Sequence, residues 1–90
     1  MNNATELTDA QQLLLRTMLQ VLADQPAEIA EAGWHGLVEA RLQVQIGLDD
    51  FNAFRDRCLI NRWSIGAPNK VTGKMRWTIT PAGAIALQQL

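Results

Sequence analysis

The sequence has 90 residues, of which 48% are apolar and 19% charged, and its formal net charge is −1. This length provides one domain with one core, and the composition is too apolar and too weakly charged for an intrinsically disordered chain. One cysteine and one histidine exclude a disulfide scaffold and a usual zinc site, and no apolar run reaches the roughly 20 residues of a membrane helix. We therefore expect a single soluble, cytoplasmic domain over residues 1–90, without a metal or cofactor, in which residues 1–7 are flexible.

The first predicted helix covers residues 9–23. Thr8 and Gln11 have the spacing of a capping box, which satisfies backbone N–H groups at a helix start. Apolar residues then recur at spacings of three, four and seven, as on the buried face of a helix. They are Leu14, Leu15, Met18, Leu19, Val21 and Leu22. Leu13 falls on the polar side, either as an ordinary exposed leucine or as part of a self-association surface.

The next segment has weaker signals. Pro26 and Gly33 frame a run of helix formers, which predicts a short helix over 26–33. Residues 33–36 are then expected to form a turn or a short extended piece anchored by Trp34. His35 is either a structural histidine or a pH-sensitive or ligand contact, and we expect the structural role.

A second short helix is predicted over 37–43, because this run contains good helix formers. The alternation of Leu42, Val44, Ile46 and Leu48 has the period of a strand and competes with this interpretation. A turn is expected around Gly47.

The third major helix is predicted from Asp49 to about residue 60. Asp49 is the expected cap, Asp50 is a second acid in the first turn, and Leu48 precedes them as a hydrophobic residue. One side of this helix carries Phe51, Phe54, Cys58 and Leu59 and is expected to be buried. We expect Cys58 to be a small buried hydrophobe and not a redox centre.

Two half-buried strands are predicted over 62–65 and 75–79, because apolar and polar residues alternate in both. The face expected to be buried carries Trp63, Ile65, Met75, Trp77 and Ile79. Residues 68–74 between the strands contain turn formers and two lysines, which predicts a basic hairpin loop.

A last helix is predicted to begin after Thr80, which offers a hydroxyl cap, with Pro81 in its first turn. Ile85, Leu87 and Leu90 are expected to dock this helix on the core.

This order of elements resembles that of a winged helix-turn-helix domain. Residues 59–65 resemble the end of a recognition helix that leads into the first wing strand. Residues 76–87 resemble the closing run of the family, in which Thr-Pro-x-Gly starts the last helix, although Ala82 stands where MarR- and PadR-like bacterial regulators often have an acidic residue. The resemblance implies an α+β fold with a three-helix core, a C-terminal β-hairpin wing and a short closing helix.

The charges divide unevenly along the chain. Residues 1–50 contain two arginines and eight carboxylates, a net charge of −6, whereas residues 51–90 contain six basic residues and one acid, a net charge of +5. This division indicates a face that meets a polyanion, unless surface pairs between the two halves neutralise it.

The resemblance implies double-stranded DNA as the partner, with the helix of about 49–60 in the major groove and the basic wing of 68–76 on the backbone. Asn52 and Arg57 would then read base edges, because asparagine pairs with adenine and arginine with guanine. The remaining expected DNA contacts, mainly to phosphates, are Arg55, Arg62, Asn69, Lys70, Thr72, Lys74 and Arg76.

Two functions remain open at this point. The first is a small bacterial transcription regulator that binds DNA and forms a homodimer through residues 9–23 and 81–90. The second is a winged-helix interaction or adaptor module that binds a protein and not DNA. An enzyme is not expected, because the chain has no phosphate-cradling glycine loop, metal cluster or nucleophile paired with a base.

Overall fold

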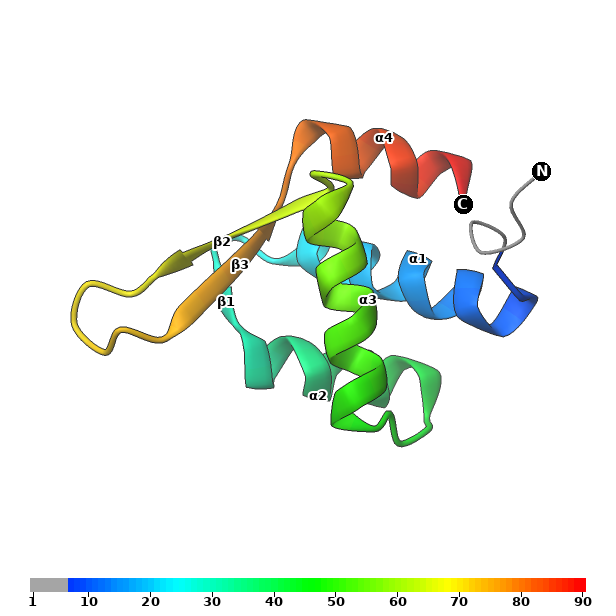
Figure 1. The fold of residues 1–90 in the computed structure, drawn as a ribbon, viewed down its shortest axis with the longest axis horizontal. Helices are drawn as coiled ribbons and strands as arrows, with labels where there is room; N and C mark the ends of the chain where they lie inside the picture. The colour runs from blue at the N-terminus through cyan, green and yellow to red at the C-terminus, as the bar shows by residue number, and fades with distance from the viewer. Residues whose placement is uncertain (1–6) are drawn as a thin grey trace.

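A computed structural model of the chain describes residues 7–90 as an α+β domain (Figure 1). Its elements are α1 (Asp9–Asp24), β1 (Ile29–Ala30), α2 (Glu31–Leu42), α3 (Leu48–Ile60), β2 (Ser64–Pro68), β3 (Met75–Ile79) and α4 (Pro81–Gln89). The segment expected to be flexible lies outside the described residues except for Leu7, which packs against the core. Within residues 7–90, no helix combines the length and the apolar character needed to span a membrane.

Helix α1 forms as predicted and extends to Asp24. The capping box is present, since Gln11 N donates to Thr8 Oγ1 over 3.1 Å and Thr8 N donates to Gln11 Oε1 over 3.0 Å. The residues fully covered on its inner face are Leu15, Met18, Leu19 and Val21. Leu13 lies outside this face and is 44% exposed.

The three strands form an antiparallel sheet in the order β1-β3-β2, so the central strand is the last in sequence. The two-residue strand β1 pairs Ile29 with Trp77 and Ala30 with Arg76. Strand β1 is not predicted by the sequence, because two residues show no period and their partners lie far along the chain. Strands β2 and β3 form a hairpin that reaches away from the helices in Figure 1. This arrangement is compatible with a winged helix.

The predicted helix over 26–33 and the turn over 33–36 are wrong. Residues 31–42 form one helix, α2, which contains Gly33 and Gly36 and includes most of the predicted helix over 37–43. Each glycine costs a helix interior about 1 kcal/mol relative to alanine. Burial of Trp34 and Val38, four residues apart on one face, outweighs that cost. Helix α2 ends at Gln43, whose φ of 55° is left-handed, and a loop over residues 43–47 follows.

Helix α3 begins one residue earlier than predicted, so Gly47 is the cap and Asp49 lies in the first turn. Phe51 and Cys58 are buried as expected, but Leu59 is exposed.

The predicted inner face of the first hairpin strand is wrong for Ile65, whereas Trp63, just before the strand, packs against the core as expected. Arg62 has a left-handed φ of 61°, so the extended strand starts only at Ser64. Ser64 and Gly66 pair with Ile79 and Trp77 and therefore share their inward face. Ser64 is buried, and Ile65 is 53% exposed on the outer face. Met75, also expected to be buried, is exposed.

Helix α4 starts as predicted, with Thr80 Oγ1 accepting from Gly83 N over 3.0 Å and Pro81 in the first turn. Its buried residues are Gly83 and Ala86, with Leu87 and Leu90 packed at the edge of the core. Ile85, which was expected to dock the helix, is exposed. The small residues face inward because α4 lies too close to the start of β2 for a large side chain.

The core has two parts that share Phe54 and Ile79 at their edges. The larger part joins α1, α2, α3 and the sheet through Met18, Val21, Leu22, Trp34, Val38, Phe51 and Trp77. The smaller part joins α1, α3 and α4 through Leu15, Leu19, Cys58 and Ala86. Helix α3 thus packs on α1 and α2 through Phe51 and on α1 and α4 through Cys58.

Cys58 provides a test of this packing. Burial raises the pKa of its thiol from 9.0 to about 12, against a smaller opposing effect of the Arg57 charge. Because the thiolate is the reactive form, we expect a chromogenic disulfide reagent at pH 8 to react only after urea is added. Prompt reaction of the folded protein would contradict the burial.

The same pKa shift has a consequence for stability. The folded state keeps a thiol proton that the unfolded state releases, so the free energy of unfolding decreases as the pH rises from about 9 towards 12. Urea melts of a Cys58→Ala variant are expected to lack this component.

Candidate nucleic-acid interface

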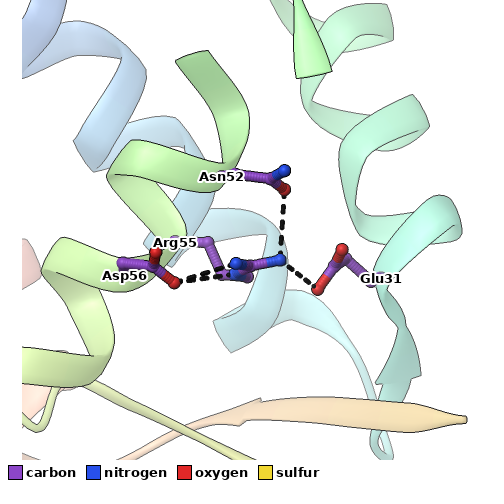
Figure 2. A network of polar contacts seen from close by, with 4 residues as sticks. All are labelled: Glu31, Asn52, Arg55 and Asp56. Carbon is purple, nitrogen blue, oxygen red and sulfur yellow. Dashed lines mark hydrogen bonds and ion pairs between the residues drawn. The ribbon is translucent and has the colours of Figure 1, made fainter. Parts of the chain in front are cut away.

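Arg55 lies in a polar network that ties α3 to the first turn of α2 (Figure 2). Its Nη1 donates to Glu31 Oε1 over 2.9 Å and to Asn52 Oδ1 over 3.1 Å. Its Nε and Nη2 donate to Asp56 Oδ1 over 3.1 and 2.9 Å, and its guanidinium lies 5.9 Å from the centre of the Trp77 ring. Arg55 is therefore committed to interactions within the protein.

The electrostatics of this network favour a permanent charge on Arg55. Partial burial opposes that charge, but hydrogen bonds with Asp56 and Glu31, together with their negative charges, outweigh burial and raise the pKa of the guanidinium. Glu31 also lies in the first turn of α2, where a carboxylate interacts favourably with the helix dipole.

The two residues expected to read bases are both half-buried on α3. The amide oxygen of Asn52 accepts a hydrogen bond from Arg55, so the orientation of the amide is set by that contact. The carbonyl of Arg57 accepts from the backbone N–H and the side-chain amide of Asn61, at 3.1 and 2.8 Å, which closes the end of the helix.

The outer face of α3 is not basic. Asp49, Asp50 and Asp56 are exposed there. Two large apolar side chains, Leu48 and Ile60, are 61% and 80% exposed. The carboxylates oppose a close approach of phosphates to this helix, although the Asp56 charge is partly compensated by Arg55.

The hairpin turn is held by its own polar side chains. Asn69 Oδ1 accepts from the N–H groups of Val71 and Thr72 at 2.8 and 2.9 Å, and Thr72 Oγ1 accepts from Lys74 N at 3.3 Å. Gly73 has a φ of 74°, which favours glycine. Asn69 and Thr72, two of the expected DNA contacts, thus shape the loop, and the exposed side chains of Lys70 and Lys74 project from it.

The remaining predicted contacts are exposed cations. Arg62 lies at the start of the hairpin, and Arg76 lies on β3 opposite the small residues Ala30 and Ala67. Within residues 7–90, no carboxylate lies within ion-pair distance of Arg62, Lys70, Lys74 or Arg76. By contrast, Arg41 pairs with Asp24 at 2.6 Å, which lowers the pKa of that carboxyl. Among the described residues, the charge of the basic hairpin is therefore uncompensated.

The reason for this difference lies in the sequence. Residues 57–90 contain five basic residues and no aspartate or glutamate, so the hairpin has no acid of its own. Arg41 and Arg55 find their acids in α1, α2 and the middle of α3.

A second polar group shapes the α2–α3 loop: His35 has the structural role expected of it, and Glu39, which was not predicted, acts beside it. His35 Nε2 lies 2.7 Å from the carbonyl oxygen of Ile46, and its ring stacks on Phe51 with centroids 4.4 Å apart. Glu39 Oε2 accepts from Ile46 N over 2.8 Å. The spacing of His35 and Glu39, four residues apart, was the only signal, and it has meaning only once both lie on one helix.

No three side chains of His, Cys, Asp or Glu in residues 7–90 lie close enough together to hold a metal ion. No protein-family model, curated protein or solved structure matches this chain.

Proposed function

We propose that the protein is a winged helix-turn-helix domain that binds double-stranded DNA as a small transcription regulator. The order of helices and strands, with β1 and β2 flanking β3, supports the winged-helix assignment. In this proposal α3 faces the major groove, and the β2–β3 hairpin is the wing that lies on the backbone and the adjacent minor groove.

The observation that carries the proposal is the uncompensated charge of the hairpin. Arg62, Lys70, Lys74 and Arg76 are exposed and have no carboxylate partner among residues 7–90. Phosphate contacts release counterions from DNA, which favours binding. A cation that already pairs with a carboxylate gains less binding free energy from this release than an unpaired one. The hydrogen bonds of Asn69 and Thr72 order the backbone that carries Lys70 and Lys74 before binding, which lowers the entropy cost of ordering the loop.

The residues of α3 take different roles. Arg55 is a positioning residue, because it fixes α3 against Glu31 of α2. Arg57 is the proposed base-reading side chain, since arginine binds guanine through its two acceptors. Asn52 reads a base only if its oxygen exchanges the Arg55 contact for the base edge.

The test is fluorescence anisotropy of a labelled mixed-sequence duplex, titrated with protein over a series of salt concentrations. Four phosphate contacts predict that the logarithm of the binding constant falls with the logarithm of salt concentration with a slope of about −4. In a Lys70→Gln, Lys74→Gln variant the slope is expected to weaken by about 2. Binding is also expected to weaken by about tenfold or more at moderate salt.

The matched control is an Ala27→Glu, Gln89→Glu variant, which changes the net charge by the same amount at two exposed positions outside α3 and the hairpin. It should keep the slope of the original protein. An equal loss in both variants would assign the effect to net charge, and no binding at low salt would refute the DNA proposal.

One observation favours the alternative, a protein-interaction module. The outer face of α3 combines Asp49, Asp50 and Asp56 with exposed Leu48 and Ile60. Exposed apolar side chains at the two ends of the helix, with carboxylates near them, fit a partner with apolar and basic side chains better than they fit DNA. Absence of DNA binding at low salt, with the fold intact, would make this alternative the leading one.

A further inference from the structure

Arg55 fixes the direction of the side-chain amide of Asn52 on α3, the helix that faces the major groove in the proposed function. Arg55 Nη1 donates to Asn52 Oδ1 over 3.1 Å. A guanidinium carries donors only, so the amide oxygen and not the amide nitrogen has to face it. Asn52 therefore turns its nitrogen away from Arg55, as Figure 2 shows, while its oxygen is occupied.

The guanidinium cannot turn away from Asn52 without losing its other contacts. Nη1 donates to Glu31 Oε1 as well as to Asn52, and Nε and Nη2 both donate to Asp56 Oδ1. These four hydrogen bonds use four of the five N–H groups of an arginine side chain. Glu31 belongs to α2 and Asp56 follows Arg55 on α3, so acceptors hold the guanidinium from two sides (Figure 2). Arg55 is thus a fixed donor beside Asn52.

The occupied oxygen changes what Asn52 can recognise on DNA. An asparagine selects adenine because its amide oxygen accepts from the N6 amine of the base while its amide nitrogen donates to N7. With the oxygen bound to Arg55, Asn52 offers donors alone. Adenine, guanine and thymine all present an acceptor in the major groove, so a donor alone does not single out adenine.

We infer that Arg55 determines specificity at this position by keeping Asn52 from selecting adenine. This role of Arg55 depends on the proposed binding of DNA by α3. To select adenine, Asn52 would have to exchange a hydrogen bond from a charged donor for one from a neutral base amine, and bonds to charged groups are roughly twice as strong. The exchange would also remove the acceptor from one N–H of the partly buried Arg55 side chain.

Selection of binding sites from a pool of duplexes with random sequence tests this role. The original protein is expected to show no adenine preference that depends on Asn52, so Asn52→Ala should select adenine no less often at every position. Arg55→Met removes the donor, keeps much of the side-chain volume and frees the amide oxygen of Asn52. This variant is expected to gain a preference for adenine over guanine at one position, by about fivefold or more, as one bidentate pair provides.

A double variant shows whether the gain comes through Asn52. Asn52→Ala combined with Arg55→Met should lose the new adenine preference, a result that general loosening of α3 does not explain. Arg62→Met is the matched control, because it removes an exposed arginine that has no acid at ion-pair distance within residues 7–90. This control is expected to weaken binding without changing the preferred bases. Circular dichroism melts confirm that each variant folds.

The outcomes separate this role of Arg55 from the proposed function. If the original protein does not bind DNA at low salt, both are wrong. If it binds and folded Arg55→Met gains no adenine preference, the inference alone is overturned. The same holds if the original protein selects adenine at a position and Asn52→Ala loses that preference. This second comparison uses no Arg55 variant, so the inference stays falsifiable if Arg55→Met does not fold.

Discussion

Replacing Gly83 with alanine is expected to cost the domain more than about 3 kcal/mol of unfolding free energy, at or above the upper end of overpacking effects. A Cβ atom at this position would overlap the carbonyl oxygen of Trp63 and lie 2.8 Å from Ile79 Cγ1. The Trp63 carbonyl has little freedom to move, since it accepts a hydrogen bond from Thr80 N over 2.9 Å. The added methyl group would therefore push α4 away from the start of the hairpin.

Gly36→Ala is the matched control for this prediction. Gly36 lies in α2 with a conventional helical backbone, and no atom lies within 4 Å of the position of an added Cβ. Alanine is favoured over glycine in a helix, so this variant is expected to gain about 0.5–1 kcal/mol. Urea unfolding of both variants measures the difference. A Gly83→Ala protein as stable as the original would show that α4 does not pack closely at this point.

Trp34→Ala is expected to lower the unfolding free energy by about 3–5 kcal/mol, as for other large buried aromatic residues. Trp34 is fully buried and lies edge-on to Phe51, with ring centroids 5.1 Å apart, and 5.7 Å from Trp77. Its Nε1 donates to the carbonyl oxygen of Met18 over 3.0 Å. The side chain thus connects α1, α2, α3 and the sheet, and a cavity there would loosen all four.

Trp34→Phe separates the ring from its hydrogen bond. This variant keeps part of the aromatic volume but loses the donor to the Met18 carbonyl. Loss of the hydrogen bond is expected to lower the unfolding free energy by about 1–2 kcal/mol, and the smaller ring adds a modest cavity cost. Thermal and urea melts followed by circular dichroism rank the two variants. Equal stability of Trp34→Ala and the original protein would contradict the central role of this side chain.

Local sequence signals predicted α1, α3, the hairpin loop and α4. Each signal acts over a few residues: Thr8 and Gln11 bond each other's backbone, Thr80 caps Gly83, and Asn69 and Gly73 shape the turn. The residues that make these interactions are therefore close together in the sequence, so the interactions can form before any tertiary contact is made.

The middle of the chain shows the limit of such signals. Gly33 and Gly36 predict a break, yet α2 continues through both because Trp34 and Val38 are buried together. The inner face of β2 could not be predicted either, since the left-handed Arg62 delays the strand and shifts the alternation by one residue.

The sequence by itself determined the capped helices, the basic hairpin and the absence of acids after residue 56. Only the tertiary structure decided which cations are reached by an acid from another element. Asp56 is the neighbour of Arg55 in the sequence, but packing of α3 on α2 is needed to bring Glu31, 24 residues away, to its guanidinium. The same packing leaves the hairpin cations away from every described acid, because ion pairing depends on distances between elements that no local pattern encodes.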